Sequence, residues 1–110
     1  MQPPEAIHSR AAAARLAYST HDRTMQNHLG ACRSAYNDAL GSLRAAATLM
    51  KTSKDNREAI ISDISAAMRS VKTCEDNFRE APGMAFPLRR VNNSLMKMVK
   101  NSLAIGSQLK

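Results

Sequence analysis

Two apolar seams on either side of a short polar turn constrain the fold of this chain more than any other feature. Both seams have apolar residues spaced by three or four positions, which is the period of one face of an α-helix. Their members are Met25, Leu29, Cys32, Tyr36, Ala39, Leu43, Ala46 and Met50 in the first, then Ile60, Ile64, Ala67, Val71, Cys74 and Phe78 in the second. The pattern predicts a helical hairpin from about Thr24 to Arg79.

Two cysteines indicate how the arms of this hairpin face each other. The turn is Thr52-Ser53-Lys54-Asp55, and Cys32 and Cys74 each lie 21 residues from Ser53. Both arms of an antiparallel hairpin rise about 1.5 Å per residue, so the two cysteines stand at the same height on their seams. We predict a disulfide between Cys32 and Cys74. Two buried free thiols are the alternative, because cysteine is also a common small core residue.

Capping residues and prolines predict where four helices begin and end. A first helix is expected over residues 5–19, and Ser19-Thr20-His21-Asp22 supplies capping residues for the second. Asp55 with Glu58 three positions later fits a capping box at the start of a third helix over residues 56–79. Ala81-Pro82-Gly83 ends that helix, and Pro87 suits the first turn of a fourth.

The outer helices are expected to contribute one seam each. The seam of the first comprises Ile7, Ala11, Ala14 and Tyr18, and that of the fourth comprises Leu88, Val91, Leu95, Met98, Ser102 and Ile105. Because the connections are short, neighbouring helices should be antiparallel. The sequence therefore predicts an all-α fold. It is one domain over residues 1–110, an up-down-up-down four-helix bundle with one disulfide joining helices two and three.

The net charge of +7 favours an acidic partner. No apolar run is long enough to span a membrane, and the chain has no recognisable nucleic-acid-binding module. We therefore expect neither a membrane nor a nucleic acid as partner. Residues 1–5 lack the basic and apolar regions of a signal peptide. Because a disulfide requires an oxidising compartment, either the chain is a piece of a secreted protein or its cysteines stay reduced.

The polar side chains form no pattern typical of catalysis or of metal or cofactor binding. His21 and His28 could share a helix face, but they offer two ligands at most when Cys32 is in a disulfide. Glu-x-x-His occurs once, at residues 5–8, and no serine stands in a Gly-x-Ser-x-Gly elbow. We expect a protein that is not an enzyme, with its histidines on a solvated surface. The sequon Asn92-Asn93-Ser94 falls inside a predicted helix, so we expect it to be unused.

Four blocks of sequence resemble the plant pectin methylesterase and invertase inhibitor family. Ile64-Ser65-Ala66-Ala67-Met68 and Thr73-Cys74-Glu75-Asp76-Asn77-Phe78 resemble its third helix. Cys32-x3-Tyr36-x2-Ala39-Leu40 resembles the start of its second helix. Asn92-Asn93-Ser94-Leu95 through Asn101-Ser102-Leu103-Ala104-Ile105 resembles its closing segment. The similarity covers roughly Arg23 to Leu109, and the Thr-Cys-Glu-Asp block is its most specific part.

The resemblance implies a function as well as a fold. Inhibitors of this family are extracellular proteins of the apoplast and cell wall, and they occlude the pectin-binding cleft of pectin methylesterase in a one-to-one complex. Invertase inhibitors carry Pro-Lys-Phe near the start of helix three, where this chain reads Asn56-Arg57-Glu58-Ala59. Pectin methylesterase is thus the favoured partner over cell-wall or vacuolar invertase. A basic helical module that binds acidic polymers directly is the alternative from another class.

The chain also departs from the family at its N-terminal side. Members normally begin with a signal peptide and a short helical hairpin that holds a second cysteine pair, and neither is present here. The first helix therefore resembles a truncated one, and we expect self-association through the uncovered N-terminal side. The same domain occurs as the pro-region of some pectin methylesterases, so that origin stays open.

Two polar stripes are the candidate enzyme-binding residues. Ser34, Asp38 and Gly41 run beside the seam of helix two, and Arg69, Thr73 and Asp76 run beside the seam of helix three. Both stripes can border the groove between the two arms. By resemblance, Asp38, Thr73 and Asp76 belong to the surface that faces the enzyme. The family favours acids where this chain has Ser34 and Gly41, which implies a difference in affinity or partner. An ordinary solvated surface is the alternative for each residue.

Overall fold

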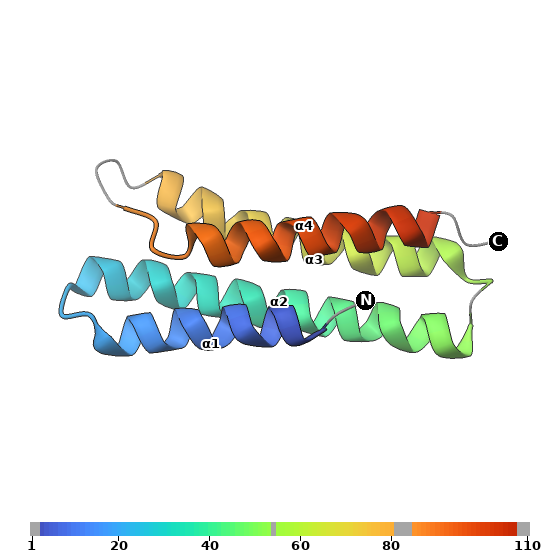
Figure 1. Ribbon diagram of the computed structural model, residues 1–110, viewed down its shortest axis with the longest axis horizontal. Helices are drawn as coiled ribbons and strands as arrows, with labels where there is room; N and C mark the ends of the chain where they lie inside the picture. The colour runs from blue at the N-terminus through green and yellow to red at the C-terminus, as the bar shows by residue number, and fades with distance from the viewer. Residues whose placement is uncertain (1–2, 54, 81–84, 108–110) are drawn as a thin grey trace.

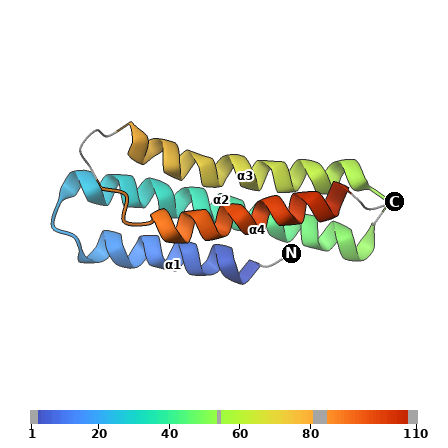
Figure 2. The same ribbon diagram turned by 45° about the horizontal axis from the view of Figure 1, so that its top comes forward.

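The chain folds into four antiparallel α-helices that run up, down, up and down along one long axis (Figure 1). The computed structural model describes residues 3–53, 55–80 and 85–107. The helices are α1 (Pro3–Ser19), α2 (Arg23–Thr52), α3 (Arg57–Arg79) and α4 (Arg89–Ser107). The bundle measures 49 × 22 × 17 Å. Figure 2 shows the same helices turned by 45°. The predicted all-α bundle is confirmed.

The start of α2 follows the prediction, whereas the start of α3 differs from it by one residue. The Asp22 carboxylate accepts hydrogen bonds from the backbone N–H groups of Thr24 and Met25, at 2.9 and 3.3 Å. The predicted capping box at Asp55 and Glu58 is wrong. The turn continues to Asn56, which precedes the first residue of α3 and makes no side-chain cap bond. Glu58 is therefore one position too early in the helix to complete the box.

The segment between α3 and α4 is described only in part. The predicted stop signal at 81–83 lies outside the described residues, but α3 does end at Arg79, as expected. Pro87 lies in the turn before α4 instead of in its first helical turn. There the backbone N–H of Arg89 donates to the Phe86 carbonyl at 3.2 Å.

The helices α2 and α3 contribute most of the buried core. The six residues predicted for α3 are all buried, and so are the six central residues of the seam predicted for α2. Met25 and Met50, at the two ends of the α2 seam, are half-buried against the same core. Large apolar side chains at helical spacing are buried here on the face that the pattern indicates.

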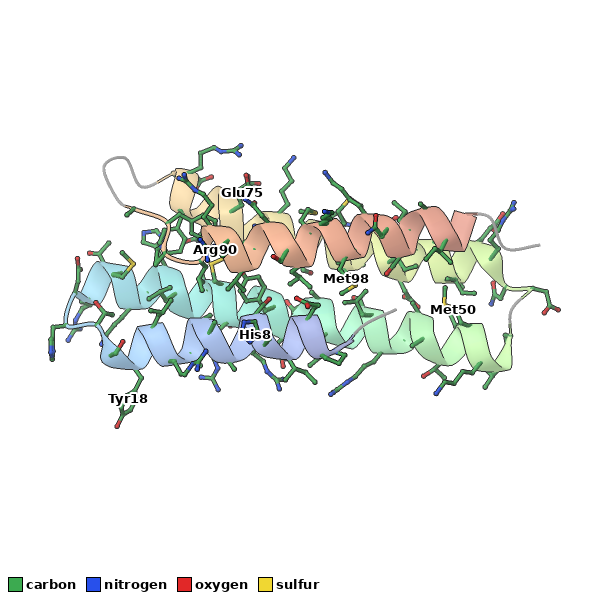
Figure 3. All side chains as sticks on the ribbon, viewed as in Figure 1. His8, Tyr18, Met50, Glu75, Arg90 and Met98 are labelled. Atoms are coloured by element: carbon green, nitrogen blue, oxygen red, sulfur yellow. A yellow bond between two sulfur atoms is a disulfide. The ribbon has the colours of Figure 1, made fainter. Side chains whose placement is uncertain are left out.

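The predicted seam of α1 is wrong. Ile7 and Tyr18 are 38% and 93% exposed, Ala11 is also exposed, and Ala14 is only half-buried. The buried positions are Ala6, Ser9, Ala12 and Ala13. Their side chains are small enough for α1 to pack closely, and the Ser9 hydroxyl is satisfied by the Glu5 carbonyl at 2.9 Å. Tyr18 points away from the bundle in Figure 3.

The seam of α4 differs from the prediction at its C-terminal end. Leu88, Leu95 and Ser102 are buried as expected, whereas Ile105 is 56% exposed. Gly106 is buried against α3 instead. A Cβ atom at this position would lie only 3.4 Å from Cδ1 of Ile64, so glycine allows the two helices to pack closely here. The last turns of α4 also extend past the start of α1, so α1 does not cover them (Figure 1).

Candidate functional site

A disulfide joins the two helices that carry the candidate enzyme-binding residues. Cys32 on α2 and Cys74 on α3 are bonded and fully buried, with their Cα atoms 4.5 Å apart. This confirms the predicted pairing and excludes the alternative of two free thiols. The bond closes a loop with a sequence separation of 42 residues, for which the chain-entropy model gives about 4 kcal/mol of stabilisation. As a result, α2 and α3 present their outer surfaces as one rigid unit.

A buried hydrogen bond between side chains ties α2 to α4 beside the disulfide. The Tyr36 hydroxyl donates to Oδ1 of Asn92 at 2.7 Å, and its oxygen lies 3.3 Å from Sγ of Cys74. Burial raises the pKa of the Tyr36 hydroxyl well above its ordinary value, so the hydroxyl stays a neutral donor. Nδ2 of Asn92 is buried without a hydrogen-bond partner among the described residues. Sequence reasoning missed this pair because Asn92 reads as a polar surface residue.

The candidate residues on α2 lie beside α1. Ser34, Asp38 and Gly41 are exposed, as a binding stripe requires. Ser34 and Asp38 line a groove of about 600 Å³ between α1 and α2. The other residues that line this groove, called the α1/α2 groove below, are Arg10, Ala11, Ala14, Gly30, Arg33 and Asn37. The stripe of α2 is thus open to solvent but borders a different helix from the one expected.

The candidate residues on α3 form an exposed stripe of their own. Arg69 and Thr73 are exposed and Asp76 is half-exposed. The Thr73 hydroxyl donates to the backbone carbonyl of Arg69 at 2.9 Å, which leaves its oxygen as an acceptor for a partner. The Asp76 carboxylate is 3.6 Å from the guanidinium of Arg79, which also pairs with Glu75 at 2.9 Å. Exposed pairs of this kind contribute about 0–1 kcal/mol, so a partner can replace them at little cost.

The expectation that all histidines lie on a solvated surface is wrong for His28. It is half-buried, and its Nδ1 is hydrogen-bonded to Oδ1 of Asn77 on α3. Its ring centroid lies 5.4 Å from that of Phe78, which stacks on Phe86 at 4.8 Å. The other two histidines are exposed. The position of His28 on α2, one turn before Cys32, was the available signal that this side chain faces α3.

Within the described ranges, no three His, Cys, Asp or Glu side chains gather where they could hold a metal ion. No helix in that part of the chain is long and apolar enough to cross a membrane. The two candidate stripes on α2 and α3 present carboxylates, hydroxyls and a guanidinium group. These groups suit recognition of a partner by hydrogen bonds and ion pairs.

Comparison with known proteins shows which family the chain resembles over most of its length. Residues 5–105 match the family described as "Plant invertase/pectin methylesterase inhibitor". The chain belongs to this family. It is 35% identical over 95 residues to a protein of Platanus orientalis named "Putative invertase inhibitor", covering 86% of this chain and 55% of that protein. A protein of the same name from Platanus acerifolia is 34% identical over 95 residues, covering 86% of this chain and 52% of that protein.

Membership confirms the resemblance seen in the sequence. The family and the two named relatives are inhibitor proteins and not enzymes. The matched region includes both cysteines and both stripes. The chain spans about half the length of the named relatives.

Proposed function

We propose that this chain inhibits a plant pectin methylesterase by binding it one to one and covering its pectin-binding cleft. The observation that carries the proposal is the family match over residues 5–105. In this proposal the candidate residues Asp38, Thr73 and Asp76 contact the enzyme, with Ser34 and Arg69 beside them. Their exposure on α2 and α3 is compatible with that role. The chain acts by occlusion and supplies no catalytic group.

A stapled bundle suits inhibition by occlusion. The disulfide and the bond between Tyr36 and Asn92 hold α2, α3 and α4 together before any partner binds. A binding surface that is already ordered loses little conformational freedom on docking, so more of the interaction free energy remains as affinity. The proposed location is the apoplast or cell wall, where an oxidising environment keeps the disulfide closed.

Invertase is the second candidate partner. It is favoured by the names of the two relatives from Platanus, which both refer to invertase. Pectin methylesterase is favoured by the start of α3, where residues 56–59 read Asn-Arg-Glu-Ala and not the Pro-Lys-Phe expected of invertase inhibitors. The third candidate, direct binding of an acidic polymer, is supported by the net charge of +7.

Titration against both enzymes tests the proposal. The chain is added in steps to a plant pectin methylesterase while methanol release is followed, and to a plant invertase while hexose release is followed. We expect methanol release to fall linearly to a break at one equivalent, with invertase unaffected. A variant with Cys32→Ser and Cys74→Ser is the matched control, because it keeps the surface stripes and removes the cross-link. Loss of invertase activity alone would support the second candidate, and two unaffected enzymes would refute inhibition of either.

A further inference from the structure

The basic side chains of the bundle are distributed unevenly among its helices. Within their bounds, α1 and α2 together carry six Arg or Lys residues and two acidic ones, whereas α3 carries four of each. α4 carries four basic residues and no acidic one. Because α1 packs beside α2 (Figures 1 and 2), the α1/α2 groove lies between two helices that together carry an excess of positive charge. The groove is lined by two guanidinium groups and one carboxylate. A concave surface with an excess of positive charge raises the local concentration of anionic ligands.

Two guanidinium groups line this groove, and one of them is held in place. Nη1 of Arg10 on α1 donates to Oδ1 of Asn37 on α2 at 2.8 Å, which orients Arg10 across the groove. Arg33 lines the same groove, and no salt bridge joins Arg10 or Arg33 to an acid within the part of the chain that the structure describes. Guanidinium groups bind carboxylates with two parallel hydrogen bonds, so the groove suits a carboxylate ligand.

The remaining side chains favour a ligand that also carries hydroxyl groups. Ser34 and Asp38 add a hydroxyl and a carboxylate to the groove. A carboxylate accepts hydrogen bonds from the hydroxyl groups of a ligand.

We propose that the α1/α2 groove is a binding site for a uronic-acid saccharide, whose carboxylate lies between Arg10 and Arg33. The sugar hydroxyls form hydrogen bonds with Asp38 and Ser34. The groove volume of about 600 Å³ lies within the range of small-molecule sites. This activity goes beyond enzyme inhibition, and it does not require that inhibition occurs. Because Ser34 and Asp38 are also candidate enzyme contacts, saccharide and enzyme would compete for the α2 side of the groove.

Calorimetric titration with a defined oligogalacturonate tests this proposal, with the chain alone and no enzyme present. We expect Arg10→Gln and Arg33→Gln each to weaken binding about tenfold or more, the usual effect of losing a hydrogen bond to a charged group. Arg44→Gln is the matched control, since it removes the same charge from α2 outside the groove. Gly30→Leu tests the groove without altering charge. A Cβ atom at Gly30 would meet no other atom within 4 Å. The leucine side chain should therefore block the ligand and leave the fold intact.

Two further titrations identify the ligand chemistry. The methyl-esterified oligogalacturonate keeps the hydroxyls and lacks the charge, and polyglutamate keeps the charge and lacks the sugar. Both should bind at least tenfold more weakly than the acidic sugar. Equal binding of polyglutamate would overturn the proposal and assign the groove to an acidic protein segment. Absence of oligogalacturonate binding, or an equal effect of Arg44→Gln, would also overturn it. None of these results bears on the enzyme titration above.

Discussion

Replacing Tyr36 by phenylalanine tests whether the buried pair between α2 and α4 stabilises the bundle. The substitution removes the hydroxyl that donates to Oδ1 of Asn92 at 2.7 Å and leaves the ring in place. Nδ2 of Asn92 already has no partner among the described residues, so the whole amide would then be buried and unsatisfied. A buried polar group without a partner costs about 1–3 kcal/mol. We expect Tyr36→Phe to lower the free energy of unfolding by about 2 kcal/mol.

A double-mutant cycle separates the hydrogen bond from other effects of the substitution. Asn92→Leu removes the unsatisfied Nδ2 but leaves the Tyr36 hydroxyl without its acceptor. These effects oppose each other, so the free energy of unfolding should change by no more than about 1 kcal/mol. Combining the two substitutions leaves no unpaired polar group from this pair. The double variant should therefore be more stable than Tyr36→Phe alone by about 2 kcal/mol.

Urea unfolding of the four proteins, followed by far-ultraviolet circular dichroism, measures the cycle. Tyr18→Phe is the matched control, because it removes the same hydroxyl from a ring that is 93% exposed. That change should stay within about 0.5 kcal/mol. Additive effects of Tyr36→Phe and Asn92→Leu would refute the reasoning, because independent sites add and hydrogen-bonded partners do not.

Because the pKa of Tyr36 is raised in the folded chain, the free energy of unfolding of the unsubstituted protein should depend on pH in the alkaline range. A tyrosine in the unfolded chain titrates near pH 10. Above that pH the unfolded chain loses this proton while the folded chain keeps it, so the stability falls as pH rises. The slope from this group approaches about 1.4 kcal/mol per pH unit. Tyr36→Phe should remove this contribution. The prediction is contradicted if the free energy of unfolding of the variant falls with alkaline pH as steeply as that of the unsubstituted chain.

Four further predictions concern stability, inhibition and self-association. Opening the disulfide by Cys32→Ser with Cys74→Ser should lower the free energy of unfolding by about 4 kcal/mol, and an unchanged urea midpoint would contradict this. Gly30→Ala should raise the midpoint, by up to about 1 kcal/mol in free energy, because alanine is the better helix former and its Cβ meets no atom within 4 Å; a lower midpoint would count against it. Thr73→Ala and Asp76→Ala should each weaken inhibition of pectin methylesterase about tenfold or more without changing the helical dichroism, and full potency in both would place the interface elsewhere. Light scattering should show self-association at high concentration through the last turns of α4, which α1 does not cover (Figure 1) and where Ile105 is 56% exposed; a strict monomer would refute it.

The sequence was most informative where bulky apolar residues alternate with polar ones. In α2 and α3 this contrast predicts which face is buried, and the equal distances of Cys32 and Cys74 from the turn predict the disulfide. In α1 the run of alanines at 11–14 gives little contrast between faces. Packing then selects the small residues around Ser9 for burial, although Ile7 and Tyr18 are the larger apolar side chains.

Two other features depend on contacts that a local pattern does not contain. Asn92 is buried because its partner is Tyr36, which lies 56 positions earlier in the chain. The α1/α2 groove depends on how α2 is rotated between its neighbours. Spacing alone places Ser34 and Asp38 on one stripe of α2. It does not determine whether α1 or α3 borders that stripe.

The burial of Asn92 has a consequence for biosynthesis. Its side chain is the glycan acceptor of the sequon Asn92-Asn93-Ser94. In the folded protein this side chain is fully buried and hydrogen-bonded to the Tyr36 hydroxyl. A glycan therefore cannot be added once α4 has packed, and a glycan added earlier prevents that packing. In a secretory compartment, packing of α4 would therefore compete with glycosylation of Asn92. The mass of the secreted chain would show whether a glycan had been added before α4 packed.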